Sequence, residues 1–370
     1  MDNQRLKALH DAGQSIWLDY IARPMLHDGE LQRKLTDDVL TGMTSNPTIF
    51  EKALAEGNAY DEQLAGAPDG LAPWQLFELV ETTDVRTACD IFRPIYDATR
   101  GGDGFVSIEV SPGVANDATR TAEEARRLWK TVDRPNVMVK VPGTEEGAKA
   151  VRQLTSEGIN VNITLLFAVA AHERVIDAYL DGLEARVREG KPIDRIASVA
   201  SFFVSRVDTE VDKRLAKIGG DALKLQGKAA IANAKMAYQL FLKKFSGDRW
   251  EALRAKGARV QRPLWASTST KNPAYRDVMY VENLIGPDTV NTMPPATIEA
   301  FRDHGNVART VDADLDQARA ELSALEGIGV SMQDVTAQLL RDGLASFEKS
   351  FTTLLAGIET KLAQLHAGAA

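Results

Sequence analysis

The sequence predicts an α/β fold in which eight parallel strands, each followed by helix, close into a (β/α)8 or TIM barrel. Two observations favour it: eight short segments are rich in Val, Ile and aromatic residues, and amphipathic helical patterns separate most of them. A third disfavours an open nucleotide-binding sheet. No G-x-G-x-x-G motif follows an early strand, and no G-x-x-x-x-G-K-[ST] motif occurs.

The predicted strands span residues 16–20, 39–46, 105–110, 136–141, 159–165, 196–204, 259–267 and 288–294. Helical patterns at 118–132, 144–158 and 170–190 follow the third, fourth and fifth strands, and 208–245 after the sixth predicts two helices. Asp117 and Ser331 have the side chains and positions of helix N-caps. Two additions to a minimal barrel are expected: extra helices between strands 2 and 3 (residues 51–100) and a C-terminal helical segment (residues 321–370). We find no internal repeat or linker, so residues 1–370 are interpreted as one domain.

The composition narrows the class of protein. The 370 residues are 44% hydrophobic and 26% charged, which is typical of a globular chain. The net charge of −8 argues against a general nucleic-acid binder. The longest apolar run, residues 163–171, is far too short for a membrane span. The single cysteine, Cys89, and a polar N-terminus without a signal-peptide core fit a cytoplasmic protein.

Polar residues gather at the carboxyl ends of the predicted strands, where barrel active sites lie. Strand alternation directs Lys140 inward, because the valines at 137, 139 and 141 occupy the opposite face. The same argument directs Asp19, Glu109, Asn162, Thr164, Ser201 and Phe203 inward. The other strand-end candidates are Thr44, Ser45, Asn46, Arg206, Ser267 and Asn291.

Each residue also has an ordinary structural explanation. A strand-end lysine usually extends its ammonium group into water, and Asn46 before Pro47 fits a helix start. Their coincidence at one end of successive strands favours a site. A buried amine beside a cation tends to the neutral form, attacks carbonyls and forms Schiff bases. Carboxylates such as Asp19 and Glu109 then move the protons. The five scattered histidines form no metal-binding pair, so we expect no cofactor, although carboxylates alone could hold Mg²⁺.

Three segments resemble the transaldolase family. They are TSNPTIF at residues 44–50, the block 137–167 that begins VMVKVPGTEEG, and SFFVSRVD at 201–208. The similarity runs from about residue 16 to residue 272, and the block around Lys140 is its most specific part. The resemblance implies a barrel enzyme whose Schiff base forms on Lys140. It implies acid–base catalysis by Asp19, and a water held by Glu109 and Thr164.

The resemblance also implies substrate contacts. Asn46, Asn162 and Ser201 would bind hydroxyl groups of a dihydroxyacetone unit, and Arg206 would bind phosphate. Ser267 matches a family serine. The second phosphate-binding arginine of many members is absent from WASTSTKN (residues 265–272), and Lys271, one residue out of register, is the candidate replacement. Phe203 occupies a position where the related fructose-6-phosphate aldolases have tyrosine.

The expected reaction is transfer of a dihydroxyacetone unit from sedoheptulose 7-phosphate to glyceraldehyde 3-phosphate, giving erythrose 4-phosphate and fructose 6-phosphate in the pentose phosphate pathway. Two alternatives stay open: an aldolase that releases free dihydroxyacetone, and a catalytically silent barrel that only binds sugar phosphates. The expected partners are sugar phosphates, without nucleic acid or membrane, and the expected assembly is a monomer or homodimer.

Overall fold

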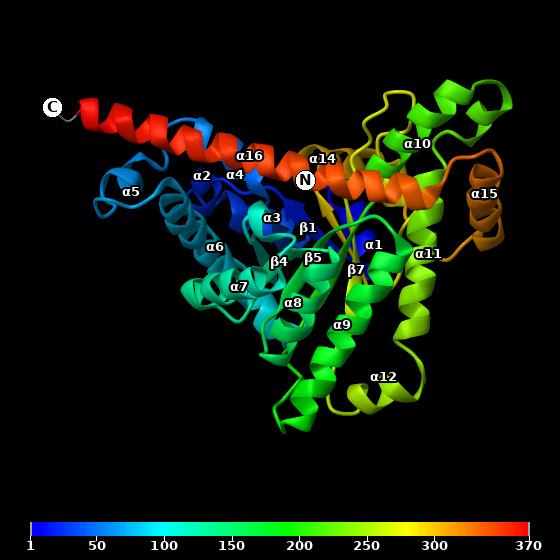
Figure 1. Cartoon of the computed structure of the whole chain (residues 1–370), viewed down its shortest axis with the longest axis horizontal. Helices are drawn as coiled ribbons and strands as arrows, with labels where there is room; N and C mark the ends of the chain where they lie inside the picture. Colours follow the sequence, from blue (N-terminus) through cyan, green and yellow to red (C-terminus); the bar gives the residue numbers. More distant parts are fainter. Residues whose placement is uncertain (1, 369–370) are drawn as a thin grey trace.

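The computed structural model describes residues 2–368 and contains the closed parallel barrel that the sequence predicts, with strands in the order β1 to β8 (Figure 1). The strands are β1 (Gln14–Asp19), β2 (Leu40–Thr44), β3 (Phe105–Glu109), β4 (Val137–Pro142), β5 (Val161–Leu166), β6 (Ser198–Phe203), β7 (Gln261–Ala266) and β8 (Thr289–Met293). Each strand falls within about three residues of its predicted segment. The prediction of fold class is confirmed.

The helices surround the barrel in the figure. They are α1 (Gln4–Asp11), α2 (Arg23–His27), α3 (Glu30–Asp37), α4 (Pro47–Ala55), α5 (Asp61–Ala65), α6 (Pro73–Ala98), α7 (Ala118–Val132), α8 (Glu145–Ser156), α9 (Val169–Arg188), α10 (Ser205–Ile218), α11 (Ala229–Lys244), α12 (Gly247–Arg254), α13 (Met279–Glu282), α14 (Pro295–His304), α15 (Leu315–Gly327) and α16 (Met332–Gly368). Two 3-10 turns, Pro112–Val114 and Gly220–Leu225, complete the elements. The predicted caps are present: Asp117 accepts from Arg120 N at 2.9 Å and Ser331 Oγ accepts from Asp334 N at 3.1 Å.

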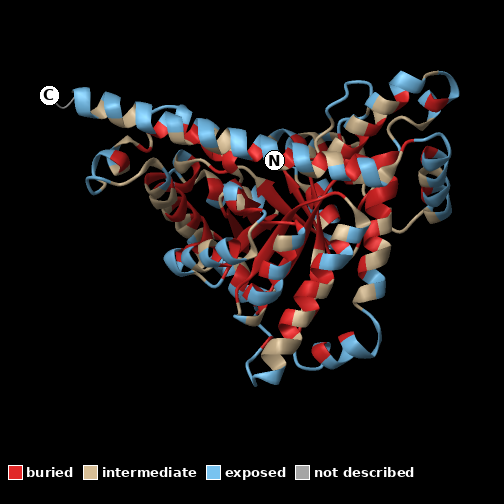
Figure 2. Cartoon of the chain, in the orientation of Figure 1, coloured by how far each residue is buried: buried red, intermediate tan, exposed pale blue. Residues whose placement is uncertain are grey.

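The two predicted additions are also present. Helices α4, α5 and α6 join β2 to β3, and α15 and α16 follow the last barrel helix. Helix α16 is 37 residues long and packs against α4, α6 and α10 (Figure 1). Its inward residues are buried while much of its outer face is exposed (Figure 2), so one apolar stripe holds it on the barrel.

Register places the inward side chains of neighbouring strands side by side. Glu109 on β3 pairs with Lys140 on β4, and Lys140 pairs with Asn162 on β5. On β1, Asp19 pairs with Thr44 of β2. Because parallel strands in register carry such residues at one height, these polar groups form a layer near the carboxyl ends of the strands.

Two glycines permit close approaches near this layer. A Cβ atom on Gly147 of α8 would lie 1.9 Å from the Pro142 carbonyl oxygen, so only glycine lets α8 start directly against the end of β4. A Cβ on Gly42 in β2 would lie 2.5 Å from the Trp17 ring, which fills the barrel interior beside it. Both glycines therefore serve packing around the polar layer.

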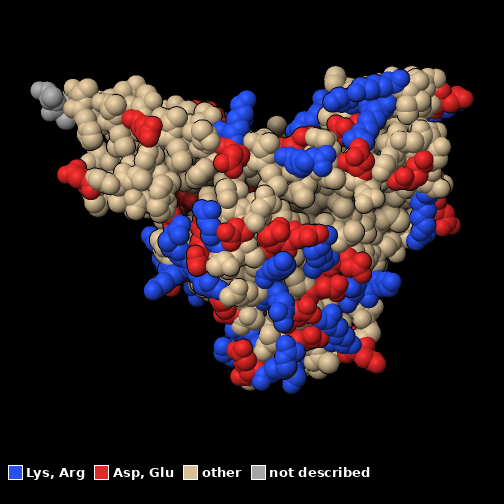
Figure 3. All heavy atoms as spheres, in the orientation of Figure 1, with Lys and Arg blue, Asp and Glu red and all other residues tan. Residues whose placement is uncertain are grey.

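The surface carries both signs of charge. On the face shown in Figure 3, Lys and Arg intermingle with Asp and Glu over the lower part of the molecule, and the upper left part has fewer charges. Within residues 2–368, no helix combines the length and apolarity that a bilayer crossing requires.

Candidate active site

A cavity of about 530 Å³ opens at the carboxyl ends of the barrel strands. Its walls include nine of the eleven residues to which the sequence analysis gives a catalytic or binding role: Asp19, Asn46, Lys140, Thr164, Ser201, Phe203, Arg206, Ser267 and Lys271. Thr44, a further strand-end candidate, lines the cavity as well. The remaining two of the eleven, Glu109 and Asn162, are buried beside Lys140 in the neighbouring strands. The structure thus brings these eleven residues to one end of the barrel, whereas the strand-end candidate Asn291 does not line the cavity and accepts a hydrogen bond from Thr268 Oγ1 at 2.8 Å.

Lys140 is the centre of this arrangement. Its side chain is 7% exposed, and its Nζ donates to the Ser45 carbonyl oxygen at 3.1 Å. The same Nζ lies 3.7 Å from Glu109 Oε2, which makes a buried ion pair. Removing either partner would strand a charge in a protein interior, which is costly. Strand alternation explains the placement, because Val139 and Val141 occupy the opposite face of β4.

Glu109 titrates in the neutral range. Burial raises its pKa from 4.5 to about 7, with the Lys140 charge opposing the rise and the Asp19 charge adding to it. Its Oε2 accepts no hydrogen bond from the described residues, and Thr164 Oγ1 is likewise buried without a bond. Because both oxygens are buried without a partner, each can bind a small polar molecule such as water.

Asp19 ends β1 and lines the cavity. Thr44 Oγ1 donates to its Oδ1 at 2.8 Å, and Thr44 is itself bonded to Thr292 at 2.5 Å. Burial raises the Asp19 pKa, while the Lys140 charge and the Thr44 hydrogen bond oppose the rise. A carboxyl group whose pKa is raised in this way is a stronger base than an ordinary aspartate, which suits it to take a proton from a substrate hydroxyl group.

A hydrogen-bonded series lies beneath the cavity. Asn162 Nδ2 donates to Ser107 Oγ at 3.0 Å, and Ser201 Oγ donates to Asn162 Oδ1 at 2.6 Å. This series fixes the orientation of the Asn162 carboxamide, and Ser201 also lines the cavity. Asn46 starts α4, since its Oδ1 accepts from Ile49 N at 2.9 Å, and it also lines the cavity. Asn46 can therefore both cap α4 and contact a ligand in the cavity.

Two cations, Arg206 and Lys271, also line the cavity. Arg206 stands in the first turn of α10, and its guanidinium carbon lies 5.1 Å from the Phe203 ring centre. Burial lowers its pKa, as it does that of Lys271, and the Arg206 charge lowers the Lys271 pKa further. The two like charges are therefore near enough to interact, and a doubly charged anion between them would relieve their repulsion.

Other cavity residues escaped the sequence analysis. Tyr20, Thr48, Lys52, Ser269 and Thr292 line the walls, and Ser346 and Phe347 of α16 contribute to the rim. Most of these residues lie outside the predicted strands; the exceptions are Tyr20, at the end of the predicted segment 16–20, and Thr292, in β8. Ser346 and Phe347 belong to a helix that returns to the mouth from about 140 residues beyond β6, which no local pattern reveals.

The described residues contain no group of three or more His, Cys, Asp or Glu side chains arranged to hold a metal ion. The site instead offers a buried lysine, two carboxyl groups whose pKa burial raises, hydroxyl and amide groups, and two cations. These groups suit carbonyl chemistry on a polyhydroxylated, anionic substrate.

A closed (β/α)8 barrel with such residues at its strand ends defines a barrel enzyme. Comparison with known proteins supports this class and identifies the family. The chain belongs to the transaldolase and fructose-6-phosphate aldolase family, whose model, "Transaldolase/Fructose-6-phosphate aldolase", matches residues 16–358.

Curated relatives support the transaldolase branch. The chain is 50% identical to a transaldolase of Acidothermus cellulolyticus, covering 96% of both chains. It is 50% identical to a transaldolase of Thermobifida fusca, covering 97% of this chain and 98% of the relative. A transaldolase of Trichodesmium erythraeum is 46% identical over 99% of each. This similarity over the full length assigns the chain a transaldolase activity and places it among the transferases.

Proposed function

We propose that the chain moves a dihydroxyacetone unit from sedoheptulose 7-phosphate to glyceraldehyde 3-phosphate through a Schiff base on Lys140. The buried Lys140–Glu109 pair at the barrel mouth is the observation that carries this proposal. A lysine held inside the protein with an adjacent proton donor is what imine formation requires.

In the first step, the Lys140 ammonium group gives a proton to the Glu109 carboxylate, and the neutral Lys140 Nζ attacks the ketone carbon of the donor sugar. Glu109 then supplies the proton with which the carbinolamine oxygen leaves as water. The pKa of Glu109, about 7, gives it both protonation states at physiological pH. A water held between Glu109 Oε2 and Thr164 Oγ1 would carry the proton, which gives these two oxygens the partners they otherwise lack.

In the second step, Asp19 removes the proton of the hydroxyl group next to the scissile carbon–carbon bond. The bond breaks, the aldose leaves, and the three-carbon unit stays on Lys140 as an enamine. Reversal of these steps with the acceptor aldehyde forms the new bond. The raised pKa of Asp19 favours its role as base, since a stronger base takes the hydroxyl proton more readily.

Binding groups surround the reacting carbons. Asn46, Asn162 and Ser201 would hold hydroxyl groups of the dihydroxyacetone unit, with Ser267 beside them. Arg206 and Lys271 would hold the phosphate at the far end of the sugar. Arg206 offers a bidentate fork, whereas Lys271 offers a point charge on a loop and contributes less.

The remaining features complete the proposal. We infer one barrel domain over residues 1–370, sugar-phosphate substrates, a place in the pentose phosphate pathway and a cytoplasmic location. Net charge −8 and the mixed surface agree with the absence of a nucleic-acid partner. A monomer or homodimer is the expected assembly.

A coupled assay with sedoheptulose 7-phosphate and glyceraldehyde 3-phosphate tests the function. Formation of both erythrose 4-phosphate and fructose 6-phosphate supports it. Release of free dihydroxyacetone without an acceptor would assign the aldolase activity instead, and binding without turnover would assign a silent barrel. Treatment with EDTA should leave the transfer rate unchanged, because no step uses a metal.

A further inference from the structure

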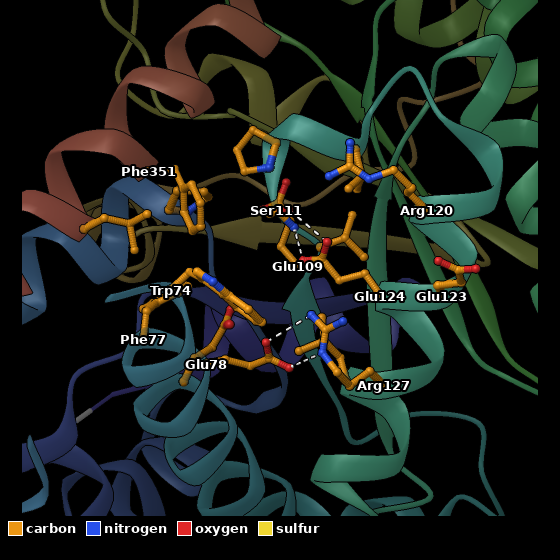
Figure 4. Close-up of a pocket in the computed structure, with 17 residues that line it drawn as sticks. Trp74, Phe77, Glu78, Glu109, Ser111, Arg120, Glu123, Glu124, Arg127 and Phe351 are labelled. Carbon is orange, nitrogen blue, oxygen red and sulfur yellow. Dashed lines mark hydrogen bonds and ion pairs between the residues drawn. The ribbon is translucent and has the colours of Figure 1, made fainter. Parts of the chain in front are cut away.

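Two further cavities each contain a residue of the proposed site. One, of about 410 Å³, is lined by residues of α6, α7 and α16 and reaches Glu109, and in its wall Glu78 pairs with Arg127 at 2.8 Å (Figure 4). The other, of about 260 Å³, is lined by residues of α10, α13 and the loop that follows β7. Lys271 lines both this smaller cavity and the substrate cavity. The smaller cavity therefore adjoins the phosphate end of the proposed site.

Lys271 stands on an exposed part of the loop after β7. This loop spans residues 267–278 between β7 and α13, and its residues 271–274 are exposed. Lys271 Nζ donates to Ser269 Oγ at 3.2 Å. Because Ser269 belongs to the same loop, this bond does not fix Lys271 relative to the barrel. Another contact must set the position of the lysine.

The charge of Arg206 acts to drive Lys271 away. Both cations line the substrate cavity. Burial lowers the Lys271 pKa, and the Arg206 charge lowers it further, which shows that the two charges interact. A lysine on a free loop would relieve this repulsion by moving its ammonium group into water. Keeping the two cations together before substrate binds therefore requires a contact that holds the loop.

Tyr275 supplies such a contact. Its hydroxyl group donates to Asp212 Oδ2 of α10 at 2.5 Å, and Asp212 Oδ1 accepts from Gly227 N at 3.0 Å. Burial raises the Tyr275 pKa and the Asp212 hydrogen bond raises it further, so the phenol remains a donor at physiological pH. A hydrogen bond to a carboxylate at this distance is a strong one. In the described part of the chain, no other hydrogen bond joins residues 271–275 to α10.

The packing of the Tyr275 ring and a tight turn make this contact stiff. Gly227 has a φ of +71°, and a Cβ atom there would lie 2.9 Å from the Tyr275 ring, so the ring packs directly on the Gly227 backbone. Asn272 Oδ1 accepts from Ala274 N at 2.9 Å, and the Asn272 carbonyl oxygen accepts from Tyr275 N at 3.0 Å. These bonds fold the intervening residues into one turn, which links Lys271 to Tyr275 through a short constrained segment.

We propose that Tyr275 is a positioning residue for the substrate phosphate, because its hydrogen bond to Asp212 holds Lys271 beside Arg206. Asp212 and Arg206 belong to the same helix, α10, so the bond fixes the loop to the element that carries the other cation. This inference rests on the proposed function, in which Arg206 and Lys271 bind phosphate. Two cations already in place bind a doubly charged phosphate more tightly than two that must first be brought together.

Tyr275→Phe tests the contact, since it keeps the ring and removes the hydroxyl group alone. At saturating erythrose 4-phosphate, the KM for fructose 6-phosphate should rise about 3- to 10-fold, a modest factor because Lys271 is an exposed point charge, while kcat should stay within about twofold. The inhibition constant of inorganic phosphate, used as a competitive probe, should rise by a similar factor. Borohydride trapping of unphosphorylated dihydroxyacetone on Lys140 should be unchanged.

Tyr179→Phe is the matched control. Its hydroxyl group donates to the Arg259 carbonyl oxygen at 2.7 Å from α9, so this variant loses a phenol hydrogen bond of similar length away from the loop. Tyr179→Phe should leave the KM for fructose 6-phosphate and the phosphate inhibition constant unchanged, whatever it does to the melting temperature.

A double-variant cycle separates positioning from a general structural effect. If Tyr275 acts through Lys271, adding Tyr275→Phe to Lys271→Ala should raise the KM no further, and Asp212→Ala should reproduce the loss seen in Tyr275→Phe. An unchanged KM in Tyr275→Phe, a further loss in the double variant, or an equal loss with dihydroxyacetone would overturn the inference. If Lys271→Ala and Arg206→Ala both left the phosphate inhibition constant unchanged, the proposed phosphate site itself would be wrong.

Discussion

Replacing Phe203 by tyrosine should shift the enzyme from transfer toward release of free dihydroxyacetone. The enamine on Lys140 either waits for an acceptor aldehyde or takes a proton and is hydrolysed. Phe203 has no proton to give, and it lines the substrate cavity together with Lys140, Asp19 and Thr164. Phe203→Tyr places a phenol at this position, where it can act as a general acid toward the enamine or the water.

The structure sets the expected size of the effect. A well-placed acid contributes about 10²–10⁴-fold. Phe203 is 6% exposed. Its ring centre lies 5.2 Å from the ring centre of Phe167 and 5.1 Å from the guanidinium carbon of Arg206. Because these neighbours restrict the ring, we expect the lower end of the range, about 10- to 100-fold more cleavage of fructose 6-phosphate. If the hydroxyl group found no partner, it would cost about 1–3 kcal/mol of unfolding free energy.

Three measurements on Phe203→Tyr show whether Phe203 controls the fate of the enamine or only packs in the core. They are dihydroxyacetone release, transfer to glyceraldehyde 3-phosphate, and melting temperature. The control is Phe202→Tyr. Phe202 is the adjacent residue of β6, points to the opposite face and packs on Trp265 and His172. The Phe202→Tyr variant should have a lower melting temperature and an unchanged ratio of dihydroxyacetone release to transfer. If Phe203→Tyr behaves like Phe202→Tyr, Phe203 is core packing and has no part in partitioning the enamine.

Three further predictions follow from the site and its supports. Arg206→Ala should lower kcat/KM for phosphorylated substrates roughly 30- to 1000-fold, which corresponds to about 2–4 kcal/mol. Lys271→Ala should lower the same kcat/KM by a smaller factor. Equal losses with unphosphorylated dihydroxyacetone would refute a phosphate role. Glu109 must be protonated to act as the acid, so the rate of imine formation should fall as pH rises through about 7. Glu109→Gln should lack this inflection. If the unsubstituted protein and Glu109→Gln had the same pH profile, the inflection would belong to another group. Gly147→Ala should cost about 2–3 kcal/mol in denaturant unfolding, because its Cβ would meet the Pro142 carbonyl oxygen, whereas Gly113→Ala, with nothing within 4 Å, should cost little; similar values for the two would contradict the packing explanation.

Local patterns were sufficient for the barrel and for the strand-end residues. Alternation is a two-residue rule, so the valines of β4 fix the direction of Lys140 without knowledge of the rest of the chain. The same rule directs Glu109, Asn162 and Ser201. Since all eight strands are parallel, residues at their carboxyl ends necessarily meet at one mouth. This is why a sequence could predict a cluster of residues that lie far apart along it.

Features that depend on packing between distant segments were not predictable. Helix α16 has an ordinary amphipathic pattern, and nothing in it reveals that Ser346 and Phe347 reach the substrate cavity. Whether Lys271 lay near Arg206 also depended on the path of the loop after β7, which the structure supplies.

Mapping the trapped intermediate tests the central claim most directly. The protein is incubated with fructose 6-phosphate, reduced with borohydride, digested and examined by mass spectrometry, with Lys140→Ala treated in parallel. The account predicts a stable three-carbon adduct on Lys140 alone, and loss of both adduct and transfer in Lys140→Ala. An adduct on another lysine, or transfer that persists in Lys140→Ala, would contradict it.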